Sequence, residues 1–185
     1  MLVFACEEDA RRVLEVLPKR FGSYGLTLHP EKTRLLRFRP PSAQSAGRGD
    51  ALRSFEFLGL THYWGKSRQG SWVVKRKTAA RRFGRTVKRI AQWCRLNHHQ
   101  PVPWPHQHLV HKLRGHDAYY GITGNGPALR RLRYEVARIG QKWLNRRSHR
   151  ARMPWERFQG LLARYPLPAP VVYHSVYRHA AKPCA

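Results

Sequence analysis

Beyond residue 77, hydrophobic residues recur every three or four positions, which is the spacing of amphipathic α-helices. The pattern predicts helices over residues 78–97 and 105–120, a third helix that starts after Pro127, and a short fourth helix over 154–164. The third helix has the most regular apolar stripe, formed by Leu129, Leu132, Val136, Ile139 and Trp143. This part of the chain is therefore predicted to be helical throughout.

The first 77 residues have shorter hydrophobic runs, which predict strands around a single helix. That helix is amphipathic and starts near Glu7, where an acidic run favours a helix N-terminus. Strands are predicted over residues 1–5, 26–28, 33–38, 55–64 and 71–75. The last two form a hairpin with a basic tip, Gly65–Gln69, after a loop at 39–53 that shows no periodicity. Strands and helices in this order predict an α+β fold class.

Positive charge dominates the composition and is concentrated in the second part of the chain. The 185 residues include 36 Lys and Arg against 10 Asp and Glu, which gives a formal net charge of +26. Residues 1–56 hold 10 of the basic residues and 7 of the acids, whereas residues 57–185 hold 26 and 3. This imbalance indicates a polyanionic partner. Nucleic acid is favoured over a membrane, because a membrane-surface helix would need a wide, bulky apolar face.

Cysteine usage and hydropathy bear on the cellular compartment. Cys6, Cys94 and Cys184 lie far apart and show neither a metal-ligand spacing nor a disulfide framework, as expected in a reducing cytosol. No apolar run approaches membrane-spanning length, and the apolar run at residues 1–6 is too short for a signal peptide. The sequence predicts a cytoplasmic protein of bacterial type that associates with RNA or the nucleoid.

Several short motifs occur together in an order that is typical of one family. They are Leu-Thr-Leu-His-Pro-Glu-Lys-Thr (26–33), Phe-Glu-Phe-Leu-Gly (55–59), Leu-Arg-Gly-His (113–116), Tyr-Tyr-Gly (119–121), Trp-Leu-Asn-Arg-Arg-Ser (143–148) and Trp-Glu-Arg-Phe (155–158). With these motifs the chain resembles, over nearly its whole length, the reverse transcriptase/maturase proteins encoded by group II introns. Several linked motifs are more specific than any one of them.

The resemblance implies a division of the chain into four parts. These are the C-terminal part of a polymerase palm (1–54), a primer-grip-like β-hairpin (55–77), a helical thumb or maturase-specific domain (78–165) and a Pro-rich tail (166–185). Phe57, Leu58 and Gly59 are the primer-grip-like residues of the hairpin. The tail itself is predicted to be extended or disordered.

The resemblance also identifies a missing feature. In that family a Tyr-Ala-Asp-Asp turn directly precedes the strand that here begins at Met1, and its aspartates help to hold the two metal ions of nucleotide transfer. We therefore expect a missing upstream segment, no Mg²⁺ site or other cofactor in this chain, and no polymerase activity from it alone. Lys32 matches a lysine that assists departure of pyrophosphate, and is expected to be a remnant of that site.

The function implied by the resemblance is binding of group II intron RNA, or of an RNA/DNA template-primer, with assistance to RNA splicing. The expected phosphate contacts are Lys75, Arg76, Lys77, Arg81, Arg82, Arg85, Lys88, Arg89, Arg130, Arg131, Arg133, Arg138, Lys142, Arg146 and Arg147. Two alternatives stay open. The chain is one piece of a split or truncated RNA-directed DNA polymerase that needs its missing N-terminal half, or it is a remnant without function.

Aromatic and histidine residues give weaker signals. Tyr63, Trp64 and Trp72 in the hairpin are candidates for stacking on unpaired bases, whereas the tryptophans of the helices fall on or beside the apolar stripes and are expected to pack. No group of histidines has nearby Cys or carboxylate residues in the sequence that would supply the remaining ligands of a zinc site. His116 and Asp117 are adjacent on a helix, so their side chains are expected to point to different sides.

Overall fold

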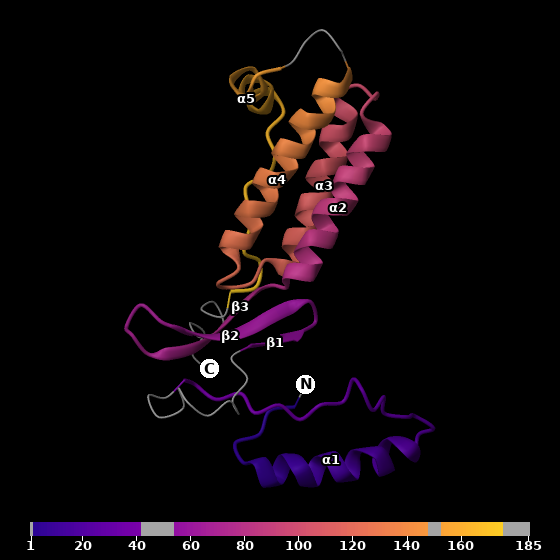
Figure 1. Ribbon diagram of the computed structural model, residues 1–185, viewed down its shortest axis with the longest axis vertical. Helices are drawn as coiled ribbons and strands as arrows, with labels where there is room; N and C mark the ends of the chain where they lie inside the picture. Colours follow the sequence, from indigo (N-terminus) through magenta and orange to yellow (C-terminus); the bar gives the residue numbers. More distant parts are fainter. Residues whose placement is uncertain (1, 42–53, 148–152, 176–185) are drawn as a thin grey trace, which may run out of the picture. The chain divides into compact units, whose positions relative to one another are not determined.

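The computed structural model describes residues 2–41, 54–147 and 153–175, which belong to two compact units divided between Arg53 and Ser54. Within these residues the fold is mixed α+β, with five α-helices and one three-stranded antiparallel sheet. The predicted α+β class is confirmed at this level. Figure 1 labels the helices and strands along the chain.

The first unit is built on one helix, α1 (Glu7–Gly22). Its first turn carries Glu7, Glu8 and Asp9 and its last turn carries Lys19 and Arg20, so charges of both signs complement the helix dipole. The apolar stripe of α1 is only partly buried, and Ala10 is its one buried residue. The helix itself was correctly predicted from the sequence.

The strands predicted over residues 1–5, 26–28 and 33–38 are wrong for the described residues, which begin at residue 2. These segments carry no strand pairing in the described residues, and Leu2 and Val3 are 61% and 83% exposed. A strand exists only where a neighbour takes its backbone hydrogen bonds, and the described part of this unit supplies no such neighbour. Hydrophobic alternation alone therefore predicted strands that the unit does not form by itself.

The second unit begins with a sheet of three consecutive strands, β1 (Ser54–Phe57), β2 (Leu60–Lys66) and β3 (Trp72–Thr78). The sequence predicted one strand over 55–64, but the chain reverses at Leu58-Gly59, where φ is 50° and 77°. Two successive positive φ values form the two-residue hairpin turn that pairs Phe57 with Leu60. The predicted hairpin with its tip at 65–69 is thus formed by β2 and β3, two strands of a three-stranded meander.

Four helices follow the sheet: α2 (Ala80–Asn97), α3 (Pro103–Tyr120), α4 (Gly126–Leu144) and α5 (Trp155–Arg164). All four confirm the predicted helices, with ends shifted by no more than a few residues. Their apolar stripes meet in one core that is formed by Ile90, Cys94, Leu109, Leu113, Leu132, Val136, Ala137, Phe158 and Leu167. Figure 1 shows α2, α3 and α4 side by side above the sheet.

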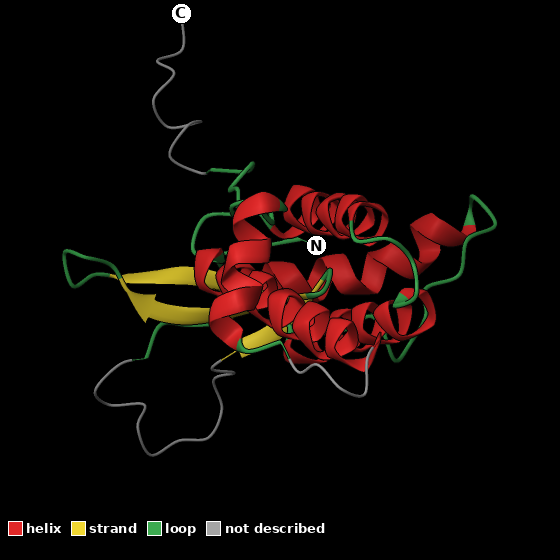
Figure 2. Cartoon of the chain, turned by 90° about the horizontal axis from the view of Figure 1, so that it is seen from above, coloured by secondary structure: helices red, strands yellow, loops and turns green. Residues whose placement is uncertain are grey.

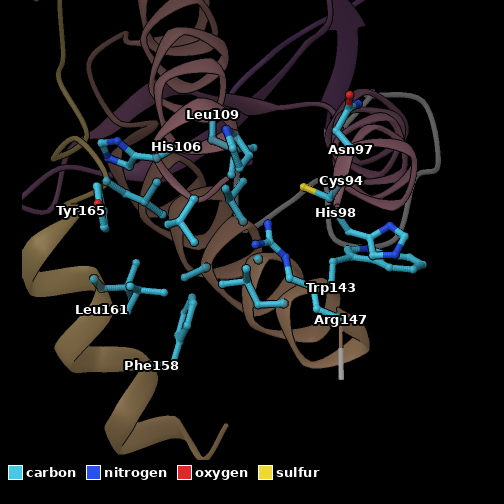
Figure 3. A pocket seen from close by; sticks show the side chains of 18 residues that line it. Cys94, Asn97, His98, His106, Leu109, Trp143, Arg147, Phe158, Leu161 and Tyr165 are labelled. Atoms are coloured by element: carbon cyan, nitrogen blue, oxygen red, sulfur yellow. The ribbon is translucent and has the colours of Figure 1, made fainter. Parts of the chain in front are cut away.

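The core leaves an apolar pocket of about 80 Å³ between these helices. Figure 3 shows its lining side chains, among them Cys94 from α2, Leu109 from α3, Trp143 from α4 and Phe158 from α5. Arg147 also lines the pocket, but its guanidinium donates a hydrogen bond to the carbonyl of Gln100. The exposed lining of the pocket is mainly apolar, so the pocket belongs to the packing of the bundle.

The segment after α5 runs along the bundle in an extended conformation. Leu167 is buried, the Val171 N–H donates to the Asp117 carboxylate at 3.2 Å, and the His174 N–H donates to the Gly121 carbonyl at 2.8 Å. A Cβ at Gly121 would lie 2.5 Å from the Val171 carbonyl oxygen, so only glycine admits this close approach. Residues 166–175 are extended, which is one of the two alternatives predicted for the tail; residues 176–185 lie outside the described residues.

Candidate nucleic-acid interface

The basic residues of α2 divide into two rows. Positions seven apart lie almost above one another on a helix, so Arg81, Lys88 and Arg95 form one row, Arg82 and Arg89 form another, and Arg85 lies between the rows. Trp93, which lies on the same side as the second row, stacks on Trp104 of α3. The second row therefore faces the α3 side of the bundle.

Another row of exposed basic residues lies on α4, the helix that packs beside α2 in the bundle. The Arg131 guanidinium lies over the Phe83 ring at 5.2 Å, so Arg131 borders α2, although Phe83 lies on the core side of α2 and outside the first row. Arg138 follows Arg131 by two helical turns and Lys142 follows by one more, on the same side of α4. We call the two rows together the α2/α4 basic seam: Arg81, Lys88, Arg95, Arg131, Arg138 and Lys142.

The positive charge of the basic seam has almost no nearby negative charge to balance it. Helix α2 contains no acidic residue, and Glu135 is the one acid on α4. Within the described residues, no Lys or Arg of either helix forms an ion pair with a carboxylate. Each row of α2 spans up to 14 residues, or about 21 Å. The seam is therefore a long cationic strip that lacks an internal counter-charge.

Several other predicted contact residues lie elsewhere or are partly used inside the fold. Arg133 donates a hydrogen bond to the Leu167 carbonyl at 3.3 Å, and Arg147 donates to Gln100, with burial lowering its pKa. Arg146 lies over the Trp143 ring at 5.0 Å. Arg130 is exposed on α4, away from the seam. Lys32 is exposed in the first unit.

The basic residues of β3 alternate between the two faces of the sheet. Lys75 and Lys77 share a face with Tyr63, and the Lys77 ammonium lies 5.1 Å from that ring. Arg76 lies on the opposite face, in register with His62. The sequence grouped Tyr63 with Trp64 and Trp72 as stacking candidates, but strand alternation places Tyr63 on the other face from the two tryptophans.

The primer-grip-like residues Phe57, Leu58 and Gly59 form the turn between β1 and β2. The Tyr119 hydroxyl donates to the Leu58 carbonyl at 3.0 Å, and the Gly59 carbonyl accepts from the Ala79 N–H at 2.9 Å. A Cβ at Gly59 would lie 2.9 Å from the Tyr120 hydroxyl. The turn therefore holds the sheet against the start of α2 and the end of α3, close to Arg82.

Asn125 is the residue that sequence reasoning missed. It is fully buried at the start of α4, where its Oδ1 accepts from the Thr78 N–H and its Nδ2 donates to the Thr78 hydroxyl and to the Tyr120 carbonyl, each at 2.8 Å. These bonds join the end of β3 to the junction between α3 and α4. Its partner Thr78 lies 47 positions away, so no local pattern marked it.

His116 and Asp117 contradict the expectation that neighbours on a helix point apart. His116 Nδ1 lies 3.8 Å from an Asp117 carboxylate oxygen, and both side chains are more than nine-tenths buried. Neither ring nitrogen of His116 has a hydrogen-bond partner in the described structure, and burial lowers its pKa to about 4. Burial raises the Asp117 pKa, although the Val171 N–H opposes that shift. The histidine is therefore neutral at pH 7 and the contact is not an ion pair.

Acidification from about pH 7.5 to about pH 5 is expected to lower the free energy of unfolding by roughly 1 to 2 kcal/mol. The unfolded chain binds a proton on His116 near its ordinary pKa of 6.5, whereas the folded chain binds it only near 4, so stability is lost as the pH falls between these values. The raised pKa of Asp117 acts in the opposite direction and offsets part of the loss.

Urea unfolding at the two pH values measures this effect, and the variant His116→Phe is its control. The variant removes the titrating ring and should retain only the smaller dependence that comes from Asp117 and from His62, whose pKa is also lowered by burial and by Arg76. An unchanged pH dependence in His116→Phe would show that the loss of stability arises elsewhere.

The tryptophans of the bundle pack as predicted. Trp93, Trp143 and Trp155 are partly buried against the core. Trp93 stacks on Trp104 at 5.7 Å between ring centroids, and His108 stacks on the same pair. These histidine contacts are aromatic packing.

Among the described carboxylates of the first unit, Glu7 forms ion pairs with basic side chains. Glu7 is held by Arg11 and Arg37, whose hydrogen bonds lower its pKa to about 2. In the described ranges, no three His, Cys, Asp or Glu side chains converge where a metal ion could bind. Over the same ranges, no helix has both the length and the apolar character needed to cross a bilayer.

The fold and the seam define a strongly basic α+β protein with a helical bundle and a projecting sheet. Comparison with protein-family models, with curated proteins and with solved structures finds no match to this chain.

Proposed function

We propose that this chain binds RNA through the α2/α4 basic seam, as the C-terminal part of a group II intron reverse transcriptase/maturase. Its role is to hold intron RNA and to assist splicing, while the RNA supplies the catalysis. The observation that carries this proposal is the seam itself, where two parallel rows of Lys and Arg face solvent without ion pairs in the described structure. Such a strip fits a phosphate backbone.

The physical argument concerns the cost of the uncompensated charge. Like charges along one helix destabilise it, and α2 has no acid to offset them. An RNA backbone placed along the seam replaces this repulsion with attraction and releases the counterions condensed on the phosphates. The motifs that resemble the maturase family favour intron RNA over other polyanions. The protein contributes counter-charge and a shaped surface, with no bond-making residue in the described part.

A second candidate function has its own supporting observation. The extended segments 2–5 and 26–28 expose Leu2, Val3 and Leu26 and form no strand pairing within the described residues. A separate polypeptide that supplies strands would complete this unit, as expected for one piece of a split RNA-directed DNA polymerase. Primer extension with and without such a partner separates the two proposals, because the RNA-binding role requires no partner.

The affinity for a structured RNA is expected to fall about 10³-fold between 50 mM and 200 mM salt, which corresponds to about six phosphate contacts. The seam has the cations for this number, since each Lys or Arg that contacts a phosphate releases about one counterion. Fluorescence anisotropy with a labelled intron-domain RNA over a salt series gives the slope.

A slope near zero, or no binding at 50 mM salt, would contradict the proposed function. It would also favour the view that the chain is a remnant without function. A DNA duplex of equal length serves as the comparison polyanion, and tighter binding of the structured RNA is the expected order.

A further inference from the structure

The β2–β3 hairpin reaches beyond the helices that pack on the sheet, as Figures 1 and 2 show. Trp72 begins β3 near the tip of this hairpin and is 41% exposed. Lys66 is directly opposite Trp72 in the register, and its ammonium lies 5.8 Å from the ring. Val74 is on the same face of β3 and is also exposed. The tip thus presents an open aromatic ring beside a cation.

The tip has a defined geometry. The Ser67 N–H donates to the Ser71 carbonyl at 2.8 Å, and the Gly70 N–H donates to the Ser67 carbonyl at 3.2 Å. Gly70 has a φ of 83°, which closes the turn in a conformation that favours glycine. The ring of Trp72 is therefore held on an ordered turn, and little conformational entropy remains to be lost when a ligand stacks on it.

The charge of this segment selects the kind of ligand. The sequence contains no Asp or Glu between Glu56 and Asp117, and the tip carries Lys66 beside the aromatic ring and Arg68 in the turn. A protein partner would need matching acids around an apolar spot, whereas a nucleotide offers a flat base and an adjacent phosphate in one unit. Bases inside a duplex are already stacked on one another, so only an unpaired base has a free face for the ring.

We propose that the hairpin tip binds unpaired nucleotides of RNA, with one base stacked on Trp72 and the adjoining phosphates beside Lys66 and Arg68. This inference rests on the proposed RNA-binding function and adds a second kind of contact to it. The seam binds phosphates along structured RNA, and the tip selects sites where a single-stranded segment is next to that structure.

The test uses the full chain and a short single-stranded RNA, together with an abasic oligonucleotide that keeps the same number of phosphates. Trp72→Ala should weaken binding of the RNA roughly tenfold and leave binding of the abasic oligonucleotide unchanged. Trp72→Phe should retain most of the affinity, because it keeps an aromatic face. Val73→Ala is the matched control, since Val73 is adjacent and exposed but lies on the other face of β3.

The outcomes separate this inference from the proposed function. If RNA binds with a steep salt dependence but Trp72→Ala binds both oligonucleotides like the wild type, the stacking site is refuted. The proposal that RNA binds along the basic seam is then unaffected. If the wild type binds no RNA at low salt, both the proposed RNA-binding function and the stacking site are refuted. If Trp72→Ala loses binding only to vesicles of anionic phospholipid, the tip is a membrane contact and the inference is also refuted.

Discussion

Replacing Asn125 by Ala is expected to lower the free energy of unfolding of the second unit by about 3 to 5 kcal/mol. The substitution removes three hydrogen bonds and leaves the Thr78 N–H, the Thr78 hydroxyl and the Tyr120 carbonyl without their partner. Thr78 is itself buried, so water does not readily replace the lost contacts. Each buried polar group that loses its partner costs about 1 to 3 kcal/mol.

Urea unfolding followed by circular dichroism measures this loss. Two further variants serve as comparisons: one removes a single hydrogen bond elsewhere, and the other tests whether Asn125 and Thr78 act together. Asn97→Ala removes one partly buried hydrogen bond, from Nδ2 to the Trp93 carbonyl, and should cost only about 1 kcal/mol. Thr78→Val, combined with Asn125→Ala, should cost less than the sum of the single changes, because the two residues share their bonds. A loss below 1 kcal/mol for Asn125→Ala would show that the junction is not held by this side chain.

The helices of the second unit could be predicted from the sequence because local periodicity determines them. The apolar residues from Leu129 to Trp143 fall on one face only if the segment is an α-helix. The structure buries Leu129, Leu132 and Val136 of this face, as expected. The break of the first hairpin at Leu58 was missed, because a leucine at positive φ contradicts local preference and depends on the contact with Tyr119. The position of the turn at Leu58 therefore depends on tertiary contacts and not on local sequence preference.

The errors in the first unit have a different physical cause. Leu2, Val3 and Leu35 have the residue types of strands, but a strand is defined by its neighbours, and the described chain provides none there. The contact between His116 and Asp117 was missed because helical spacing fixes the directions of Cβ atoms, whereas side-chain rotamers still bring adjacent polar groups to 3.8 Å in a crowded interior.

The sequence identified which basic residues are candidates for the interface, but it did not show which of them share a surface. The sequence named the basic residues of α2 as one set, whereas helical geometry divides them into two rows and the packing of Trp93 on Trp104 places the second row on the α3 side. It also assigned Arg133 and Arg147 to RNA, although both donate hydrogen bonds to backbone carbonyls of the bundle. Only the assembled bundle shows which cations share a surface with α4.

The triple variant Arg81→Gln, Lys88→Gln, Arg95→Gln is expected to weaken binding of structured RNA by about 100-fold or more at 50 mM salt. Loss of three phosphate contacts should also reduce the salt slope by about 2.7, because each contact contributes about 0.9. All three side chains are exposed, so the fold should persist and circular dichroism should be unchanged. Fluorescence anisotropy over a salt series measures both quantities.

The matched control removes the same charge from the other side of α2, with Arg82→Gln, Arg89→Gln and Lys112→Gln. Lys112 belongs to α3 and lies over Trp93, so this set shares the α3 side of the bundle. A general effect of net charge would weaken binding equally in the two triple variants, whereas a phosphate track along the seam predicts a much larger loss in the first. Equal losses would therefore refute the seam while leaving non-specific attraction intact, because that attraction depends on total charge and not on which rows of cations flank α4.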